Sequence, residues 1–115
     1  MSERIDRLNE LFKREISRIL LKEEGFDRNI LVTVTQVDIS PELSGAKVFI
    51  SVMPKEKRQE ILDFLKKDIY HIQQELNKRL YLKKIPKIVF QRERRVEQAA
   101  RIEELISKIH KNDKK

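Results

Sequence analysis

Basic side chains are concentrated in one window of the sequence, between positions 78 and 101. The nine members of this window are Lys78, Arg79, Lys83, Lys84, Lys87, Arg92, Arg94, Arg95 and Arg101. Only Glu93 and Glu97 oppose them, so the window has a net charge of +7, equal to that of the whole chain. Lysine and arginine placed against phosphates release counterions, and arginine can hold a phosphate through two parallel hydrogen bonds. The window therefore predicts contact with a polyanion rather than a surface that only aids solubility.

Residues able to catalyse a reaction are scarce. His71 and His110 are the only histidines, and neither belongs to a metal-ligand pattern such as H-x-x-x-H. The chain has no cysteine nucleophile, no G-x-S-x-G motif and no glycine-rich phosphate loop. Asp38, Glu42 and Glu93 can be weighed as a magnesium cluster, but acids scattered in this way are normally solvated. We predict a protein that is not an enzyme and that needs no cofactor, metal or small-molecule substrate.

Aromatic side chains could add base stacking, but the chain has only five phenylalanines and two tyrosines. Tyr81 lies inside the basic window and is the best candidate for stacking. A half-buried packing role for this ring is the favoured alternative, because tyrosine commonly buries its ring and leaves its hydroxyl wet. Recognition of phosphates and shape therefore fits the sequence better than recognition of particular bases.

The chain is long enough for one domain with a single modest core. We place this domain over residues 1–110, followed by a disordered basic tail at 111–115. No apolar run approaches the roughly 20 residues of a membrane span, and the N-terminus lacks the apolar stretch of a secretory signal. We therefore expect a cytoplasmic protein without a membrane partner, and a monomer.

Hydrophobic spacing predicts the elements that position the basic window. Helical periodicity covers residues 3–22, and two alternating strands at 30–40 and 46–52 are joined by a turn. A phase slip around Thr35-Gln36 predicts either a bulge in the first strand or a strand covered on both faces. Apolar steps of three and four residues over 55–82 predict one long helix, or two joined at a kink.

A short strand at 88–90 and a final helix at 96–109 complete the order helix, strand, strand, helix, strand, helix. A crossover through the long helix would make the last strand parallel to a neighbour. We therefore predict an α+β fold with a three-stranded mixed sheet and helices packed on one face.

Several segments, taken in this order, resemble the ribosome-binding factor A family. The matching pieces are residues 26–28 (F-D-R), 32–40 (V-T-V-T-Q-V-D-I-S), 46–51 (A-K-V-F-I-S) and 80–90 (L-Y-L-K-K-I-P-K-I-V-F), and Arg101-Ile102 with Leu105. They are similar to the family's D-P-R segment, its first hairpin, its L-R-x-x-P-x-L-x-F strand entry and the R-I-x-x-L of its last helix. The resemblance extends over residues 4–106, nearly the whole chain.

The resemblance implies a type II KH-like fold, binding to free 30S ribosomal subunits, and assistance in late maturation and processing of 16S rRNA. It also implies a role in adaptation to cold. An ordinary KH module holds the nucleic-acid backbone with a G-x-x-G loop, which a chain with only Gly25 and Gly45 cannot build. Side-chain charges and helix ends must then contact the RNA, and we expect about half of the nine basic residues to do so.

Two departures from the family pattern bear on this interpretation. The resemblance implies a kink in the long helix where many members have Ala-x-Gly, but this chain has Asp68-Ile69-Tyr70 there and lacks the glycine. Arg94-Arg95 replaces small polar residues before the last helix. We hypothesise that these two arginines add phosphate contacts. Two other functions stay open: a general basic DNA- or RNA-binding protein, and a protein–protein adaptor whose basic surface meets an acidic partner.

Overall fold

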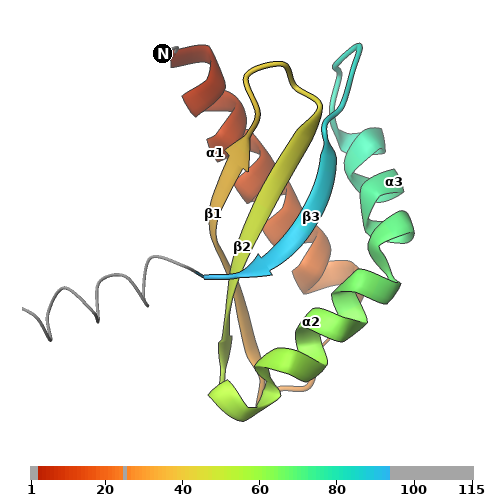
Figure 1. The fold of residues 1–115 in the computed structure, drawn as a ribbon. Helices are drawn as coiled ribbons and strands as arrows, with labels where there is room; N and C mark the ends of the chain where they lie inside the picture. Colours follow the sequence, from red (N-terminus) through yellow and green to blue (C-terminus); the bar gives the residue numbers. More distant parts are fainter. Residues whose placement is uncertain (1–2, 25, 94–115) are drawn as a thin grey trace, which may run out of the picture.

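The computed structural model describes residues 3–24 and 26–93, which form a three-stranded sheet and the helices beside it (Figure 1). In chain order the elements are α1 (Glu3–Ile19), a π-helical turn (Leu20–Glu24), β1 (Leu31–Ile39), β2 (Gly45–Met53), a 3-10 turn (Lys55–Lys57), α2 (Arg58–Lys67), α3 (Ile69–Arg79) and β3 (Lys87–Arg92). The helix predicted at 96–109 and the tail at 111–115 lie outside the described residues.

The strands form the predicted mixed sheet. β2 lies in the centre, antiparallel to β1 and parallel to β3. Val34 faces Ile50 and Gln36 faces Phe49, so Thr35 is the extra residue of a bulge. Because side chains alternate along a strand, this extra residue lets both Val34 and Val37 point into the core. The α+β class, the parallel pairing and the bulge are therefore confirmed.

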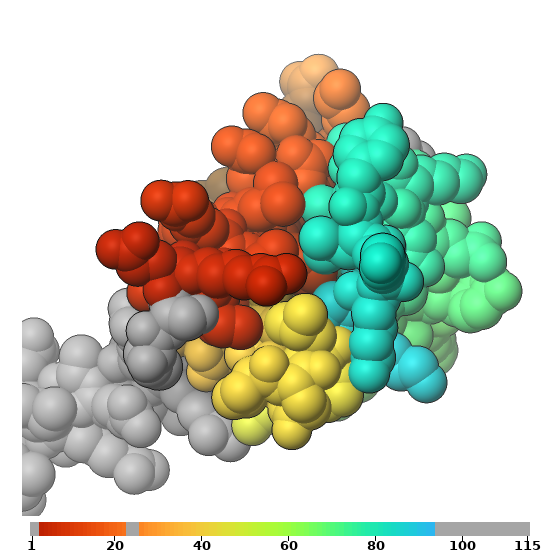
Figure 2. Space-filling model, turned by 90° about the horizontal axis from the view of Figure 1, so that it is seen from above, coloured from red at the N-terminus to blue at the C-terminus, as the bar shows by residue number. Residues whose placement is uncertain are grey.

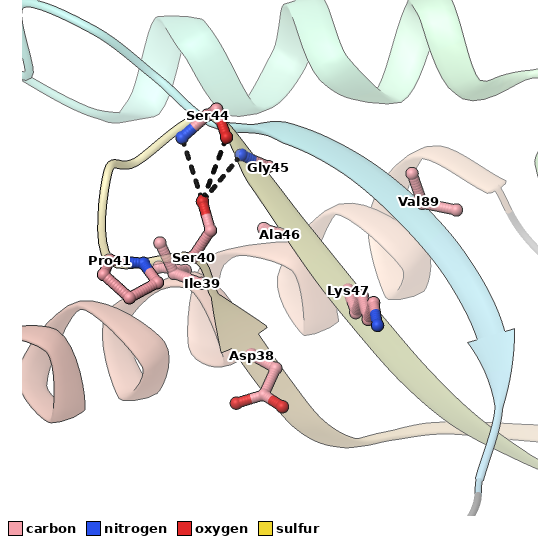
Figure 3. A pocket seen from close by; sticks show the side chains of 9 residues that line it. All are labelled: Asp38, Ile39, Ser40, Pro41, Ser44, Gly45, Ala46, Lys47 and Val89. Carbon is pink, nitrogen blue, oxygen red and sulfur yellow. Dashed lines mark hydrogen bonds between the residues drawn. The ribbon is translucent and has the colours of Figure 1, made fainter.

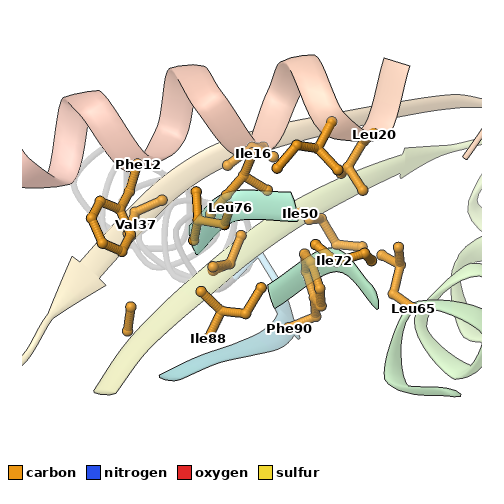
Figure 4. Packing of buried hydrophobic residues seen from close by; sticks show 14 of the residues in the cluster. Phe12, Ile16, Leu20, Val37, Ile50, Leu65, Ile72, Leu76, Ile88 and Phe90 are labelled. Carbon is orange, nitrogen blue, oxygen red and sulfur yellow. The ribbon is translucent and has the colours of Figure 1, made fainter. Parts of the chain in front are cut away.

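The helices pack on one face of the sheet, and apolar side chains fill the space between (Figure 4). In β2 the side chains of Ala46, Val48, Ile50 and Val52 are buried, as expected for a strand with one face against a core. Phe49 is buried as well, although alternation places it on the other face of the strand. Members contributed by all three helices and all three strands include Phe12, Ile16, Leu20, Val37, Ile50, Leu65, Ile72, Leu76, Ile88 and Phe90. Each such side chain contributes about 2 kcal/mol of transfer free energy.

The long helix breaks at Asp68, which separates α2 from α3. The backbone of Asp68 has φ −94° and ψ 10°, yet its N–H donates to the Phe64 carbonyl at 3.0 Å. Its own carbonyl accepts from the Ile72 N–H at 3.1 Å, so the helical hydrogen bonds continue across the break. The predicted kink thus forms without the family's glycine. α3 ends at Arg79, earlier than predicted, because Leu80 is extended (φ −114°, ψ 139°).

Candidate nucleic-acid interface

Five of the nine predicted basic residues lie together at one end of the molecule. Lys78 and Arg79 end α3, Lys83 and Lys84 lie in the 80–86 connection, and Lys87 begins β3. We call these five residues the basic end. Figure 2 views it from above, where residues 80–86 (teal) lie beside the N-terminal half of α1 (red) and the turn at 40–45 (yellow). The chain reverses here between α3 and β3, and this reversal gathers residues that span ten positions of sequence.

The 80–86 connection is anchored on both sides of its lysines. Leu80 is 7% exposed and belongs to the core, and Pro86 is fully buried. The Gln73 side chain of α3 then holds the start of β3, because its Oε1 accepts from the Ile88 N–H at 2.8 Å. Its Nε2 donates to the Pro86 carbonyl at 3.3 Å. Lysines on this anchored connection project into solvent from a backbone of defined position.

Arg79 differs from the four lysines because α1 supplies it with a partner. Its Nη1 lies 3.7 Å from Glu15 Oε1, and Arg18 Nη1 lies 3.2 Å from Glu15 Oε2. Arg14 Nε is 3.7 Å from the same carboxylate. Glu15 is buried, whereas Arg79 is a quarter exposed and its buried Nε has no hydrogen-bond partner among the described residues. Arg79 therefore joins α3 to α1 through a shared carboxylate.

The remaining members of the basic window are not part of this end. Arg92 closes β3, opposite Ile50, and the rise of an extended strand places it about 16 Å from Lys87. Arg94, Arg95 and Arg101 lie outside the described residues. Arg92 is therefore separate from the basic end in space.

Arg4 and Arg7 are two cations that the sequence analysis did not include in the candidate site. Both are exposed on the first turns of α1, and together with Leu43 and Leu82 they line a hollow of about 410 Å³. This hollow lies between α1, the 40–45 turn and the 80–86 connection. The helical spacing of Arg4 and Arg7 was visible in the sequence, but their distance from residue 82 along the chain concealed that they are neighbours in space.

Tyr81 corrects one expectation from the sequence. The residue is 99% exposed, so the half-buried packing role predicted for its ring is wrong. Its neighbours Leu80 and Leu82 contact the core instead. The ring therefore belongs to the surface of the basic end.

The 40–45 turn is closed by Ser40 (Figure 3). Its Oγ accepts hydrogen bonds from the Ser44 N–H at 3.0 Å and the Gly45 N–H at 3.2 Å. Leu43 has φ 60°, the left-handed conformation that costs roughly 1–2 kcal/mol for a residue with a Cβ. The leucine side chain packs against the core, which offsets part of this cost.

Glu42 in this turn is the acidic neighbour of the basic end. Its own backbone N–H, the Ser40 hydroxyl and the charge of Lys84 all stabilise the carboxylate, and they lower the pKa of Glu42. We expect Ser40→Ala to raise this pKa toward its usual value, because the carboxylate then loses the hydrogen bond from the hydroxyl. NMR titration of the side-chain carboxyl measures the shift, with Ser51→Ala in β2 as the control. An unchanged or lower pKa in Ser40→Ala would contradict this account.

Three other kinds of site would point to a different function: a metal site, a catalytic histidine and a membrane-spanning helix. Within 3–24 and 26–93, no three histidine, aspartate or glutamate side chains are grouped so that they could hold a metal ion. His71 lies on α3 with its Nδ1 3.3 Å from Asp68 Oδ2, at the kink rather than in a cleft. None of the helices in the described part is long and apolar enough to cross a membrane.

Comparison with solved structures identifies the fold. The described architecture is similar to the crystal structure of ribosome-binding factor A from Thermus thermophilus, with a TM-score of 0.66, 20% identity, and coverage of 76% of this chain and 93% of that one. It also matches a Thermus thermophilus ribosome-binding factor A homology model fitted into a cryo-EM map of a complex with 30S. That match has a TM-score of 0.62, 21% identity, and coverage of 74% and 90% of the two chains. The KH-like fold expected from the sequence is confirmed.

Sequence comparison is more specific. The Halothermothrix orenii ribosome-binding factor A is 38% identical over 112 residues, which are 96% of this chain and 92% of the relative. The protein of the same name from Rippkaea orientalis is 34% identical, with coverage of 94% and 87%. The family model described as ribosome-binding factor A matches residues 4–106. The chain with the basic end described above therefore belongs to the ribosome-binding factor A family.

Proposed function

We propose that this protein binds free small ribosomal subunits and assists the late maturation and processing of their 16S rRNA without catalysing a reaction. It acts as a monomer in the cytoplasm. The observation that supports this proposal is the basic end, where exposed lysines project from an anchored connection in a fold whose relatives are named for binding ribosomes. A homology model of the Thermus thermophilus ribosome-binding factor A was fitted into the cryo-EM map of a 30S complex.

The charges of the basic end suit phosphate recognition. Within residues 3–24 and 26–93, Lys83 and Lys87 make no ion pair, so their charges are available to an external anion. A lysine ammonium is a point charge on a flexible stem and tolerates many phosphate positions. Phosphate contacts fix the orientation of a protein on nucleic acid but carry no sequence information directly. Specificity for the small subunit then comes from the shape of the folded rRNA, which several such contacts must match at once.

Co-sedimentation across a salt series tests the proposal. Purified protein is mixed with small subunits, large subunits, assembled ribosomes or duplex DNA and then centrifuged at salt concentrations from about 0.05 to 0.2 M. We expect selective binding to free small subunits, with an affinity that falls steeply as salt increases, because each phosphate contact releases a counterion.

The other results of this experiment separate the alternatives. Equal binding to every particle and to DNA would indicate a general basic nucleic-acid-binding protein. Binding that survives ribonuclease treatment would indicate a protein–protein adaptor. No binding to small subunits at the lowest salt concentration would reject the proposed function. The effect on 16S rRNA is tested separately, by measuring unprocessed 16S precursor in cells that lack the protein.

A further inference from the structure

We propose that Tyr81 is a stacking platform for an unpaired RNA base at the basic end. This inference rests on the proposed function and adds a second kind of contact, to a base rather than to phosphate. Almost the whole Tyr81 residue is exposed, and it lies two and three positions before Lys83 and Lys84. A bare aromatic face beside cations is the combination with which proteins bind single-stranded nucleic acid.

The backbone around Tyr81 directs the ring outward. Leu80 is extended, and side chains alternate in direction along an extended segment. Leu80 is buried in the core and Leu82 packs against it, so the residue between them faces solvent. A tyrosine ring has only two side-chain torsions, so ordering it against a base costs little conformational entropy. The platform is therefore anchored before a base arrives.

The other exposed aromatic rings of the described residues lack this setting. Phe64 is half-exposed on α2 and makes an edge-to-face contact with Phe26, with ring centroids 5.8 Å apart. Tyr70 is exposed in the first turn of α3, beside the kink and at the opposite end of that helix from Lys78. Tyr81 alone among them is part of the basic end, so Tyr70 provides a matched control.

Stacking requires an accessible base face, which predicts the class of RNA. Bases in a duplex are stacked on each other, whereas bases in loops, bulges and strand ends can be splayed onto a protein ring. Tyr81 should therefore favour an unpaired segment of rRNA. Because every base has a flat π-face, the contact should tolerate base identity.

Tyrosine fluorescence can test this directly, because the chain has no tryptophan and only two tyrosines. In Tyr70→Phe, Tyr81 is the only tyrosine. We expect a single-stranded RNA oligonucleotide to quench its emission and the same sequence in a duplex to leave it unquenched. Tyr81→Ala should weaken single-strand binding about tenfold, whereas Tyr81→Phe, which keeps the ring, and Tyr70→Ala should leave it unchanged. The salt dependence of binding should stay the same in Tyr81→Ala, because no phosphate contact is removed.

The outcomes separate this inference from the proposed function. Unquenched emission, or equal affinity of Tyr81→Ala and the unaltered protein for the oligonucleotide, would overturn the stacking role even if small subunits bind. A loss in Tyr81→Phe as large as in Tyr81→Ala would also overturn it, because the hydroxyl rather than the ring would then matter. Quenching by the oligonucleotide without binding to small subunits would support the stacking site and reject the proposed partner.

Discussion

The triple variant Lys83→Ala, Lys84→Ala and Lys87→Ala should bind small ribosomal subunits about a hundredfold more weakly at about 0.1 M salt. Lys83 and Lys84 are exposed on the anchored connection between α3 and β3, and Lys87 is exposed at the start of β3. Three lost phosphate contacts lower the slope of log affinity against log salt by roughly two to three. Co-sedimentation of the variant with small subunits at several salt concentrations measures both quantities.

A matched variant separates this local effect from net charge. The control variant carries Lys55→Ala, Lys66→Ala and Lys67→Ala. It loses the same number of positive charges, but from exposed positions in the 3-10 turn and α2. We expect this control to retain most of the affinity and the full salt slope, because these lysines lie away from the basic end (Figure 1). Equal losses in the two variants would show that only the overall charge attracts the RNA, and would contradict an interface at the basic end.

Glu15→Ala should lower the free energy of unfolding by about 3 kcal/mol. The Glu15 carboxylate is buried between three arginines, and its removal leaves their positive charges close together without a counter-charge. Arg14 and Arg18 are largely exposed, so water screens their part of the interaction, and most of the loss comes from the less exposed Arg79. Urea unfolding followed by far-UV circular dichroism measures the change.

Glu10→Ala is the control, because Glu10 is an exposed acid on the same helix. Its loss should cost no more than about 0.5 kcal/mol. Combining Glu15→Ala with Arg79→Ala should cost less than the sum of the two single changes, since the second change removes the unpaired cation. Additive losses in the double variant, or equal losses in Glu15→Ala and Glu10→Ala, would show that the carboxylate does not join α3 to α1.

Much of the fold could be predicted because its signals are local. The phase slip at Thr35 lies within one strand, and the apolar periodicity from position 55 to 82 lies within one pair of helices. The parallel pairing of β2 and β3 follows from the known geometry of a crossover through a helix. The kink at Asp68 was less predictable. The family pattern suggested it, but the segment Asp68-Ile69-Tyr70 contains no glycine or proline that would cause it.

The candidate site was less predictable because its contacts join distant parts of the chain. Counting charges placed Arg79 with the other cations. Only the packing of α3 against α1 shows that Arg79 forms an ion pair with Glu15. Arg4 and Arg7 were overlooked for the same reason. Leu43 has a left-handed backbone that a sequence reader would assign to glycine or asparagine. Tyr81 was misjudged because the predicted helix extended to position 82, whereas Leu80 is extended and the ring between Leu80 and Leu82 faces solvent.

The Gln73 side chain has a consequence for how this protein behaves in a crowded cell. β3 is an edge strand of the sheet, and an open strand edge can pair with the strand of another molecule. The Gln73 amide accepts from the Ile88 N–H and donates to the Pro86 carbonyl, the two bonds that one residue of a further parallel strand would make. A single side chain thus satisfies the two backbone groups at the start of the exposed β3 edge, where the strand of another molecule would otherwise pair and begin an aggregate.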